Sequence, residues 1–178
     1  MGIQQAGAGD RYSIELPGIA HYTVSRDEVA VVPAADAQLM DACRLQRGAP
    51  AAAQLLLRGD APLHAATLHT PQGAVVIAGR SASGKSTAAA ALFQRGYGIL
   101  ADDLTCLHLL AGQPVVLPGY AGATLWGDAA LRLGISVAAS DRVHPALDKY
   151  VITPEPPYTD QPVPLRAIFL LAVYNVPA

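Results

Sequence analysis

The sequence predicts an α/β protein in two parts, a small α+β lobe over residues 1–60 and a larger core over residues 61–178. Three observations support this division. Short β-like segments broken by Pro and Gly occupy residues 11–33, and helical periodicity follows as far as Arg58. A hairpin, a loop, a helix and a further strand then begin near Leu63. A length of 178 residues suits one domain with a small appended lobe.

Composition and charge exclude several classes of function. A net charge of −2 gives no electrostatic footprint for nucleic acid or an anionic membrane, and 52% hydrophobic residues exclude a disordered chain. Cys43 and Cys106 have no metal-ligand spacing and are expected to be reduced thiols. The first residues lack the pattern of a signal peptide, and no apolar run reaches the ~20 residues of a membrane span. We therefore expect a cytoplasmic protein.

In the lobe, "RYSIEL", "HYTVS" and "EVAVVP" predict three strands. Residues 34–58 predict helix with an interruption at "RGAP", with Asp36 as the N-cap and Gly59 as the stop. In the core, a "TPQG" turn is expected to join strands at Leu63–Leu68 and Ala74–Ala78. A helix over Ser86–Gln94 and a strand at "YGILA" follow, and "LRAIFLLAVY" predicts a last strand.

The stretch "GRSASGKS" fits the P-loop (Walker A) pattern, and it lies between a predicted strand and a predicted helix. Its backbone N–H groups and the helix N-terminus would bind phosphate, Lys85 would contact the β- and γ-phosphates, and Ser86 would ligate Mg²⁺. Lys85 also stands out because only two of the 12 basic residues are lysines, Lys85 and Lys149. The residues expected around the phosphates are Gly79, Ser81, Ala82, Ser83, Gly84, Lys85, Ser86 and Thr87.

Asp102 and Asp103 follow the next predicted strand, whose end is expected at the same sheet edge as the loop. On an extended chain these carboxylates would point to opposite sides, so that one accepts a proton and the other serves the metal. An N-cap or a turn is the alternative interpretation of the pair. No Asn-Lys-x-Asp motif occurs, which disfavours a GTPase.

The stretch "LHAATLHTPQGAVVIAGRSASGKSTAAAALFQRGYGILADD" resembles the catalytic core of the HPr kinase/phosphorylase family. The remainder is similar to short HPr-kinase-related proteins, including kinases of lasso-peptide biosynthesis. This resemblance implies a P-loop core with a mixed sheet and flanking helices, and the cofactors ATP and Mg²⁺. It implies transfer to a serine hydroxyl, in the lasso case on the C-terminal residue of the precursor peptide.

The resemblance also implies roles for particular residues. Asp102 would be the general base, Asp103 would join Ser86 at the metal, and His64 would be the active-site histidine. A hydrogen-bonded core histidine is an equally good interpretation of His64 from the sequence, and His69 is a nearby competitor. Lys149 is either a second cation at the transferring phosphoryl group or a solvated surface residue. The competitors of Lys149 are Arg80, Arg132, Arg142 and Arg166.

Several positions depart from the family pattern. Ala82 replaces a loop glycine, Thr87 stands where the bifunctional enzymes have glutamate, and their later acidic metal motif has no match. These departures favour a plain kinase without phosphorylase activity. Asp128 would either replace the missing carboxylate or serve a helix N-terminus. Relatives continue past "PLRAIFLLAVYN", so the chain is expected to be truncated or naturally short, and a homo-oligomer is left open.

Three hypotheses for the function follow. The first is an ATP-dependent serine kinase acting on a peptide or small protein, most simply a lasso-peptide precursor. The second is a kinase with a small-molecule acceptor at the same site. The third is a nucleotide-binding regulatory or assembly protein with degenerate catalysis.

Overall fold

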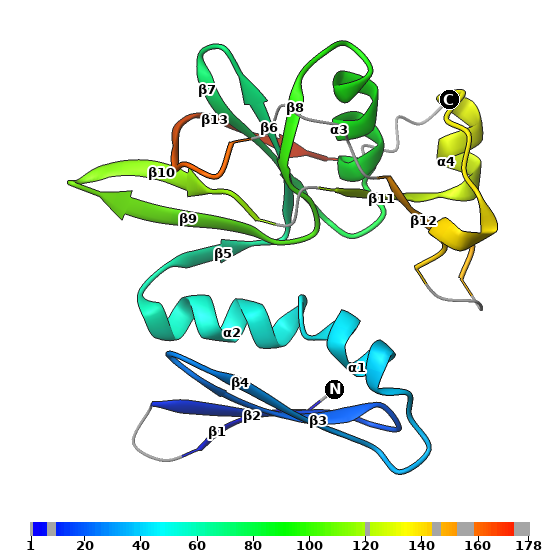
Figure 1. The fold of residues 1–178 in the computed structure, drawn as a ribbon. Coiled ribbons are helices and arrows are strands. Elements are labelled where there is room, and N and C mark those ends of the chain that lie inside the picture. The colour runs from blue at the N-terminus through cyan, green and yellow to red at the C-terminus, as the bar shows by residue number, and fades with distance from the viewer. Residues whose placement is uncertain (1, 7–9, 120–121, 144–146, 153–158, 173–178) are drawn as a thin grey trace. The chain divides into compact units, whose positions relative to one another are not determined.

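The computed structural model describes residues 2–6, 10–119, 122–143, 147–152 and 159–172. The chain divides into two compact units, Met1–Pro62 and Leu63–Ala178. Figure 1 shows the order of their elements along the chain. Among the described residues, none of the helices combines the length and apolar composition that crossing a membrane requires.

The N-terminal unit is an antiparallel four-stranded sheet with two helices. Ile14, Tyr22 and Val24 alternate along neighbouring strands and are fully buried, as the period of two in a strand requires. The Tyr22 hydroxyl donates to the Ala42 carbonyl at 2.7 Å and fixes the first helix to the sheet. The elements, in sheet order and then along the chain, are β1 (Gly2–Ala6), β2 (Arg11–Leu16), β3 (Ala20–Ser25), β4 (Val29–Pro33), α1 (Leu39–Leu45) and α2 (Ala49–Arg58).

The three strands expected between residues 11 and 33 are confirmed, as is the interruption of the helix. Gly59 ends α2 with φ +89°, as expected of a helix stop. The N-cap prediction was wrong, because Gln38 and not Asp36 precedes α1. Asp36 lies in a turn closed by a hydrogen bond from the Ala37 N–H to the Ala34 carbonyl at 3.0 Å, and the helix begins only after that turn.

The C-terminal unit is built on a mixed sheet of seven strands. Among the described residues of this unit, three helical segments and a separate two-stranded sheet accompany it. The seven strands, in sheet order, are β5 (Ala61–Leu63), β9 (Thr105–Leu110), β10 (Gln113–Leu117), β13 (Val163–Leu171), β7 (Gly73–Gly79), β6 (Ala65–Thr70) and β8 (Gly98–Ala101). The other elements are α3 (Lys85–Phe93), α4 (Gly127–Arg132), the 3₁₀ turn η1 (Ala139–Asp141), and the paired strands β11 (Ala123–Trp126) and β12 (Lys149–Ile152).

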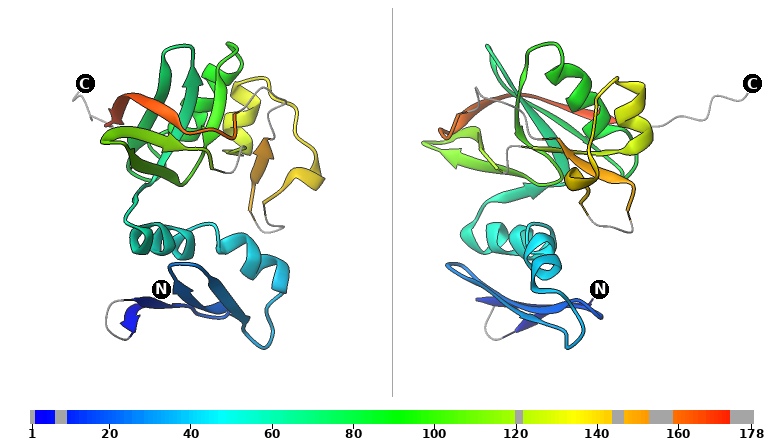
Figure 2. Two further views of the ribbon diagram at one scale, coloured as in Figure 1. Left: turned by 60° about the vertical axis from the view of Figure 1, so that its left-hand side comes forward. Right: turned by 45° about the vertical axis from the view of Figure 1, so that its right-hand side comes forward.

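Strand directions decide where the site can form. β6 pairs antiparallel with both β7 and β8, so β7 and β8 run the same way, and β13 is parallel to β7. The carboxyl ends of β7, β8 and β13 therefore meet at one edge of the sheet. Helix α3 covers one face of the sheet (Figure 2). On this face Ala89 packs with Ile77 and Ile99.

On the opposite face the sheet curls. Leu100 of β8 shares a buried cluster with Val116 of β10, although three strands separate β8 from β10 in the sheet order. The hydroxyls of Thr67 on β6 and Thr105 on β9 lie 2.7 Å apart and are fully buried. This pair anchors the chain two residues after Asp103, and the carboxylate segment is thereby fixed to β6.

The strand expected over Leu63–Leu68 is divided in two, and His64 lies at a bend between β5 and β6. The hairpin of β6 and β7 is confirmed, with Thr70 opposite Gly73. Helix α3 and strand β8 are also confirmed to within a residue or two.

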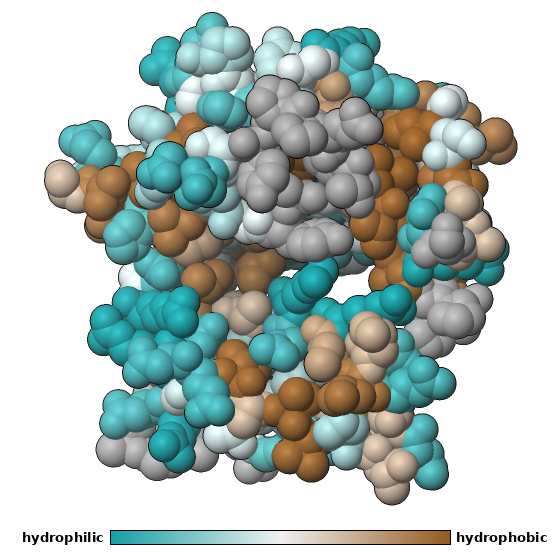
Figure 3. Space-filling model, viewed as in Figure 1, coloured by the Kyte–Doolittle hydropathy of each residue, from teal (hydrophilic) through white to brown (hydrophobic). Residues whose placement is uncertain are grey.

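Apolar (brown) residues lie among hydrophilic ones on the face drawn in Figure 3, so some apolar side chains remain exposed to solvent.

Candidate active site

The loop between β7 and α3 has backbone features that require glycine. A Cβ atom on Gly79 would lie 2.7 Å from both the Leu171 carbonyl oxygen and the Ser83 hydroxyl oxygen, which is closer than real Cβ atoms approach. Gly84 is the N-cap of α3 and has φ +94°, in the region that favours glycine. The two glycines of the P-loop pattern therefore stand where any side chain would clash or strain the backbone.

The loop presents unsatisfied hydrogen-bond donors. The Ser83 hydroxyl is buried and has no hydrogen-bond partner among the described residues. No side chain caps the first N–H groups of α3. Uncapped N–H groups at a helix N-terminus attract anions, both by hydrogen bonding and through the partial positive charge of the helix end. These donors fit a phosphate group.

Lys85 is folded against the loop that precedes it. Its side chain is 6% exposed, and its Nζ donates to the carbonyls of Gly79 at 3.1 Å and Arg80 at 3.0 Å. An ammonium group has three N–H donors, so these two bonds leave one for a bound anion. Of the other expected phosphate-site residues, Ser81 and Ala82 are exposed at the tip, and Thr87 is half-buried in the first turn of α3.

Ala82 has φ +62°, a left-handed conformation that is unfavourable for alanine. Ala82 stands where the resembled family has glycine, and glycine would adopt this positive φ with less strain. The strain lies at the tip of the loop, where backbone N–H groups would surround a phosphate.

We predict that Ala82→Gly increases the stability of the chain. Relief of a left-handed alanine is worth about 1–2 kcal/mol, and the added flexibility of glycine offsets about 0.5–1 kcal/mol, so the free energy of unfolding should rise by roughly 0.5–1 kcal/mol. Urea unfolding followed by the fluorescence of Trp126, the single tryptophan, measures this change. Ala111→Gly is a matched control, since Ala111 has φ +51° in the β9–β10 turn away from the loop. A decrease for Ala82→Gly beside an increase for the control would contradict the prediction.

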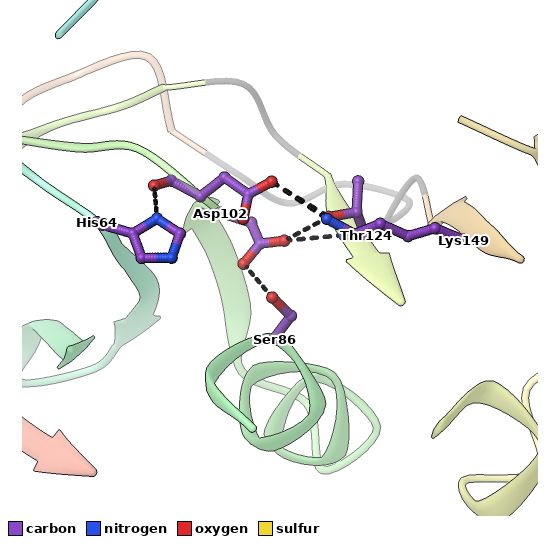
Figure 4. Close-up of polar contacts among 6 residues, drawn as sticks. His64, Ser86, Asp102, Thr124 and Lys149 are labelled. Atoms are coloured by element: carbon purple, nitrogen blue, oxygen red, sulfur yellow. Dashed lines mark hydrogen bonds and ion pairs between the residues drawn. The ribbon is translucent and has the colours of Figure 1, made fainter. Parts of the chain in front are cut away.

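Asp102 joins the loop to the end of β8. Its Oδ1 accepts a hydrogen bond from the Ser86 hydroxyl at 2.8 Å. Its Oδ2 accepts from the Thr124 backbone N–H at 2.8 Å and from the Thr124 hydroxyl at 3.3 Å. Figure 4 shows Asp102 between Ser86, at the start of α3, and Thr124, on β11. The serine expected at the metal and the first aspartate are therefore brought together, as the common sheet edge led us to expect.

The pKa of Asp102 is raised above its ordinary value, mainly because burial penalises the charged carboxylate. The negative charge of Asp103 raises it further, whereas the hydrogen bonds from Thr124 and Ser86 and the charge of Lys149 lower it. A carboxylate with a raised pKa is a stronger base than an ordinary aspartate, which suits it to accept a proton.

Asp103 has φ +66° and lies at the centre of a tight turn. The Leu104 N–H donates to the Asp102 carbonyl at 2.8 Å, which makes this a three-residue γ-turn of the rare positive-φ form. The expectation that the carboxylates point to opposite sides was wrong, because it assumed an extended chain. The Thr124 hydroxyl instead lies 3.3 Å from Asp102 Oδ2 and 3.5 Å from Asp103 Oδ2, so both carboxylates approach one group.

His64 reaches this turn from the bend before β6. Its Nδ1 lies 2.9 Å from the Asp103 carbonyl oxygen, which can only accept, so Nδ1 carries the proton. In the neutral ring Nε2 then has a free lone pair and can accept a proton, and only after accepting it can Nε2 donate to a phosphate oxygen. The interpretation as a core histidine was wrong, since His64 is exposed. His69 pairs with Ala74 near the far end of the hairpin, away from the loop.

Lys149 is on β12 and pairs with Trp126 of the neighbouring strand β11. Its Nζ is 3.5 Å from Asp103 Oδ2, so both lysines of the chain lie at the candidate site. Asp128 lies in the first turn of α4 and pairs with Arg132 at 3.1 Å, in agreement with the helix-end alternative. Arg142 contacts Tyr150 and Asp148, and Arg166 and Arg80 are exposed.

Thr124 is the site residue that sequence reasoning missed. It lies in "AGATLW", which has no recognised motif, and its contact with Asp102 depends on how β11 packs beside α3. Its backbone and hydroxyl together orient Asp102 and approach Asp103. No local signal in the sequence identifies this role.

The side chains at the loop fit a magnesium ion bound together with phosphate. No cluster of three or more His, Cys, Asp or Glu suited to a metal occurs in the described ranges. Mg²⁺ commonly takes one or two carboxylates and completes its coordination with phosphate oxygens and water. Ser86, Asp102 and Asp103 offer one hydroxyl and two carboxylates, which is a suitable set for that mode of binding.

No protein-family profile matches the chain, and no curated protein matches it. Among solved structures, the chain is similar to the HPr(Ser) kinase/phosphatase from Coxiella burnetii, with 26% identity and a TM-score of 0.32. The match covers 41% of this chain and 53% of that one, so the chain spans about half the length of that structure. This is a distant similarity over part of the fold.

Proposed function

We propose that the protein is an ATP- and Mg²⁺-dependent kinase that transfers the γ-phosphate to a serine hydroxyl of a peptide or small protein. The observation that carries the proposal is the 2.8 Å hydrogen bond between Ser86 and Asp102. It joins the Ser86 hydroxyl, beside the phosphate loop, to a partly buried carboxylate with a raised pKa. Phosphoryl transfer needs a phosphate site and a proton acceptor side by side.

On the donor side, the loop N–H groups and the N-terminus of α3 would bind the phosphates. Lys85 would contact the β- and γ-phosphates with the donor that its two carbonyl bonds leave. Mg²⁺ would be held by Ser86, with Asp103 as a ligand or as a hydrogen-bond partner of a ligand as the family resemblance implies, and would neutralise charge on the phosphate oxygens. All of these groups would stabilise the negative charge that develops on the phosphate oxygens as the bond to the leaving ADP breaks.

On the acceptor side, Asp102 would accept the proton of the attacking hydroxyl while the new O–P bond forms and the bond to ADP breaks. Its raised pKa supports this role. Lys149 would stabilise charge on the transferring group, and its ion pair with Asp103 places it within reach of that region. His64 would accept from the acceptor hydroxyl through the Nε2 lone pair, or donate to the transferred phosphate once Nε2 carries a proton.

The residues expected to contact the acceptor are exposed, which supports a peptide or protein as the acceptor. His64 and Asp103 are both exposed, so a peptide or protein segment can approach them without entering a deep cavity. The resemblance of the sequence to short HPr-kinase-related proteins supports serine as the acceptor residue. The C-terminal serine of a lasso-peptide precursor is the specific acceptor that we propose.

Transfer of label from γ-labelled ATP tests this function. The chain is incubated with Mg²⁺ and labelled ATP, in parallel with a peptide that ends in serine and with a pool of small hydroxylated metabolites. We expect label on the peptide serine, a mass gain of one phosphate, and no label when alanine replaces that serine. Label only in the metabolite pool would favour a small-molecule kinase. Binding of ATP without transfer to either pool would favour a regulatory nucleotide-binding protein.

A further inference from the structure

A pocket of about 670 Å³ opens on the side of the loop away from the carboxylates. The loop residues Gly79–Ser83 form one wall, and Leu170, Leu171 and Ala172 at the end of β13 form the other. None of its lining residues belongs to the group of His64, Ser86, Asp102, Asp103, Thr124 and Lys149. The sheet order explains the separation, since β13 lies on one side of β7 and β8 lies on the other, beyond β6.

The pocket differs in character from the carboxylate side. Leu170 is 76% exposed, and with Leu171 and Ala172 it gives the pocket an apolar wall. A ligand that covers this leucine would remove apolar surface from water, which favours binding. Arg80, exposed on the loop wall, can stack its planar guanidinium on an aromatic ring.

The outer edge of β13 offers backbone groups as well. In the described chain, β10 pairs with β13 only at Val163 and Pro164, whereas β7 pairs along the other edge up to Leu171. Backbone N–H and C=O groups on the outer edge near the pocket are therefore available to a ligand. An apolar wall with a few backbone hydrogen-bonding groups is typical of small-molecule and cofactor sites.

We propose that this pocket holds the base and ribose of the nucleotide whose phosphates the loop binds. The inference rests on the proposed function, and it orients the substrate. The nucleoside lies against the end of β13, the phosphates cross the loop, and the γ-phosphate faces Asp102 on the far side. Donor and acceptor then approach the loop from opposite sides and do not compete for space.

Calorimetric titration with ATP and with inorganic tripolyphosphate, each with Mg²⁺, tests the proposal. We expect the wild-type chain to bind ATP about tenfold or more tightly than tripolyphosphate, because only ATP fills the apolar pocket. Leu170→Asn should weaken ATP binding by about 5–10-fold through loss of apolar contact and leave tripolyphosphate binding within about twofold. Leu109→Asn is the matched control, since Leu109 is 69% exposed on β9 and does not line the pocket.

These titrations distinguish a failure of the nucleoside pocket from a failure of the proposed function. Equal binding of ATP and tripolyphosphate by the wild-type chain, or equal effects of Leu170→Asn and Leu109→Asn on ATP, would overturn the nucleoside pocket and leave the phosphate loop intact. Binding of neither ligand would overturn the proposed function and the pocket with it. Circular dichroism of each variant shows whether it is folded, and the exposure of both leucines favours native folding.

Discussion

Asp102→Asn should reduce kcat for phosphoryl transfer by about 10³-fold and leave the Kd for ATP nearly unchanged. Loss of a general base costs about 10²–10⁴-fold, and asparagine keeps the shape of the side chain. Its oxygen can still accept from the Thr124 N–H while its amide donates to the Ser86 hydroxyl. Single-turnover transfer from labelled ATP, with calorimetry for ATP binding, measures both quantities.

The pH dependence separates a base from a metal ligand. A base must be ionised, so the wild-type rate should fall on acidification at a higher pH than an ordinary aspartate would give, because the pKa of Asp102 is raised. In Asp102→Asn this acid limb should disappear. If the variant instead recovers its rate at high Mg²⁺ and keeps the acid limb, Asp102 serves the metal and the base is elsewhere.

The same substitution should stabilise the fold at neutral pH. Because the pKa of Asp102 is higher in the folded than in the unfolded chain, the folded chain binds more protons between the two values, and stability falls as pH rises through that window. Asparagine removes this cost. The variant should therefore melt at a higher temperature than wild type at pH 7, with the difference shrinking as pH falls towards the unfolded value.

Lys85→Met should reduce kcat/KM for ATP by about 10³-fold, the upper range for removal of one charge-stabilising donor. The effect should include weaker ATP binding, because Lys85 contacts the phosphates in the ground state as well as in the transition state. Methionine has nearly the same length and apolar stem, so it fills the buried position. It leaves the carbonyls of Gly79 and Arg80 without their donor, which lowers stability by about 1–3 kcal/mol for each one that water cannot reach.

Lys149→Met makes the same chemical change on the acceptor side and serves as the comparison. Lys149 is partly exposed and paired with Asp103, so we expect a smaller fall in kcat, about tenfold, with ATP affinity retained. Stopped-flow binding of ATP and steady-state transfer should distinguish the two lysines. Unchanged ATP affinity in Lys85→Met would contradict the assignment of this lysine to the phosphates.

The parts of the site that were predictable come from one continuous stretch of chain. A strand, a glycine-bounded loop, a helix and a second strand follow one another, so hydrophobic pattern and loop composition locate Lys85 and Ser86. The end of β8 then follows at the same sheet edge, which brings Asp102 to Ser86. Local signals suffice because each step of this path is local.

The parts that were missed depend on contacts between distant segments or on single dihedral angles. Thr124 reaches Asp102 only through the packing of β11, which no motif marks. The side chain of Asp103 takes its direction from the positive φ of this residue. Aspartate tolerates a positive φ, but its presence in a sequence does not indicate one. The bend at His64 likewise interrupts a run of residues that reads as one strand.

The γ-turn at Asp103 has a consequence for how this chain can change. Glycine would adopt that backbone with less strain, and it would also relieve Ala82, the other strained residue at the site. Laboratory selection for heat resistance alone should therefore favour glycine at both positions. At position 103, glycine would remove a carboxylate and its ion pair with Lys149. Selection for thermal stability should therefore favour glycine there, whereas selection for activity should favour aspartate.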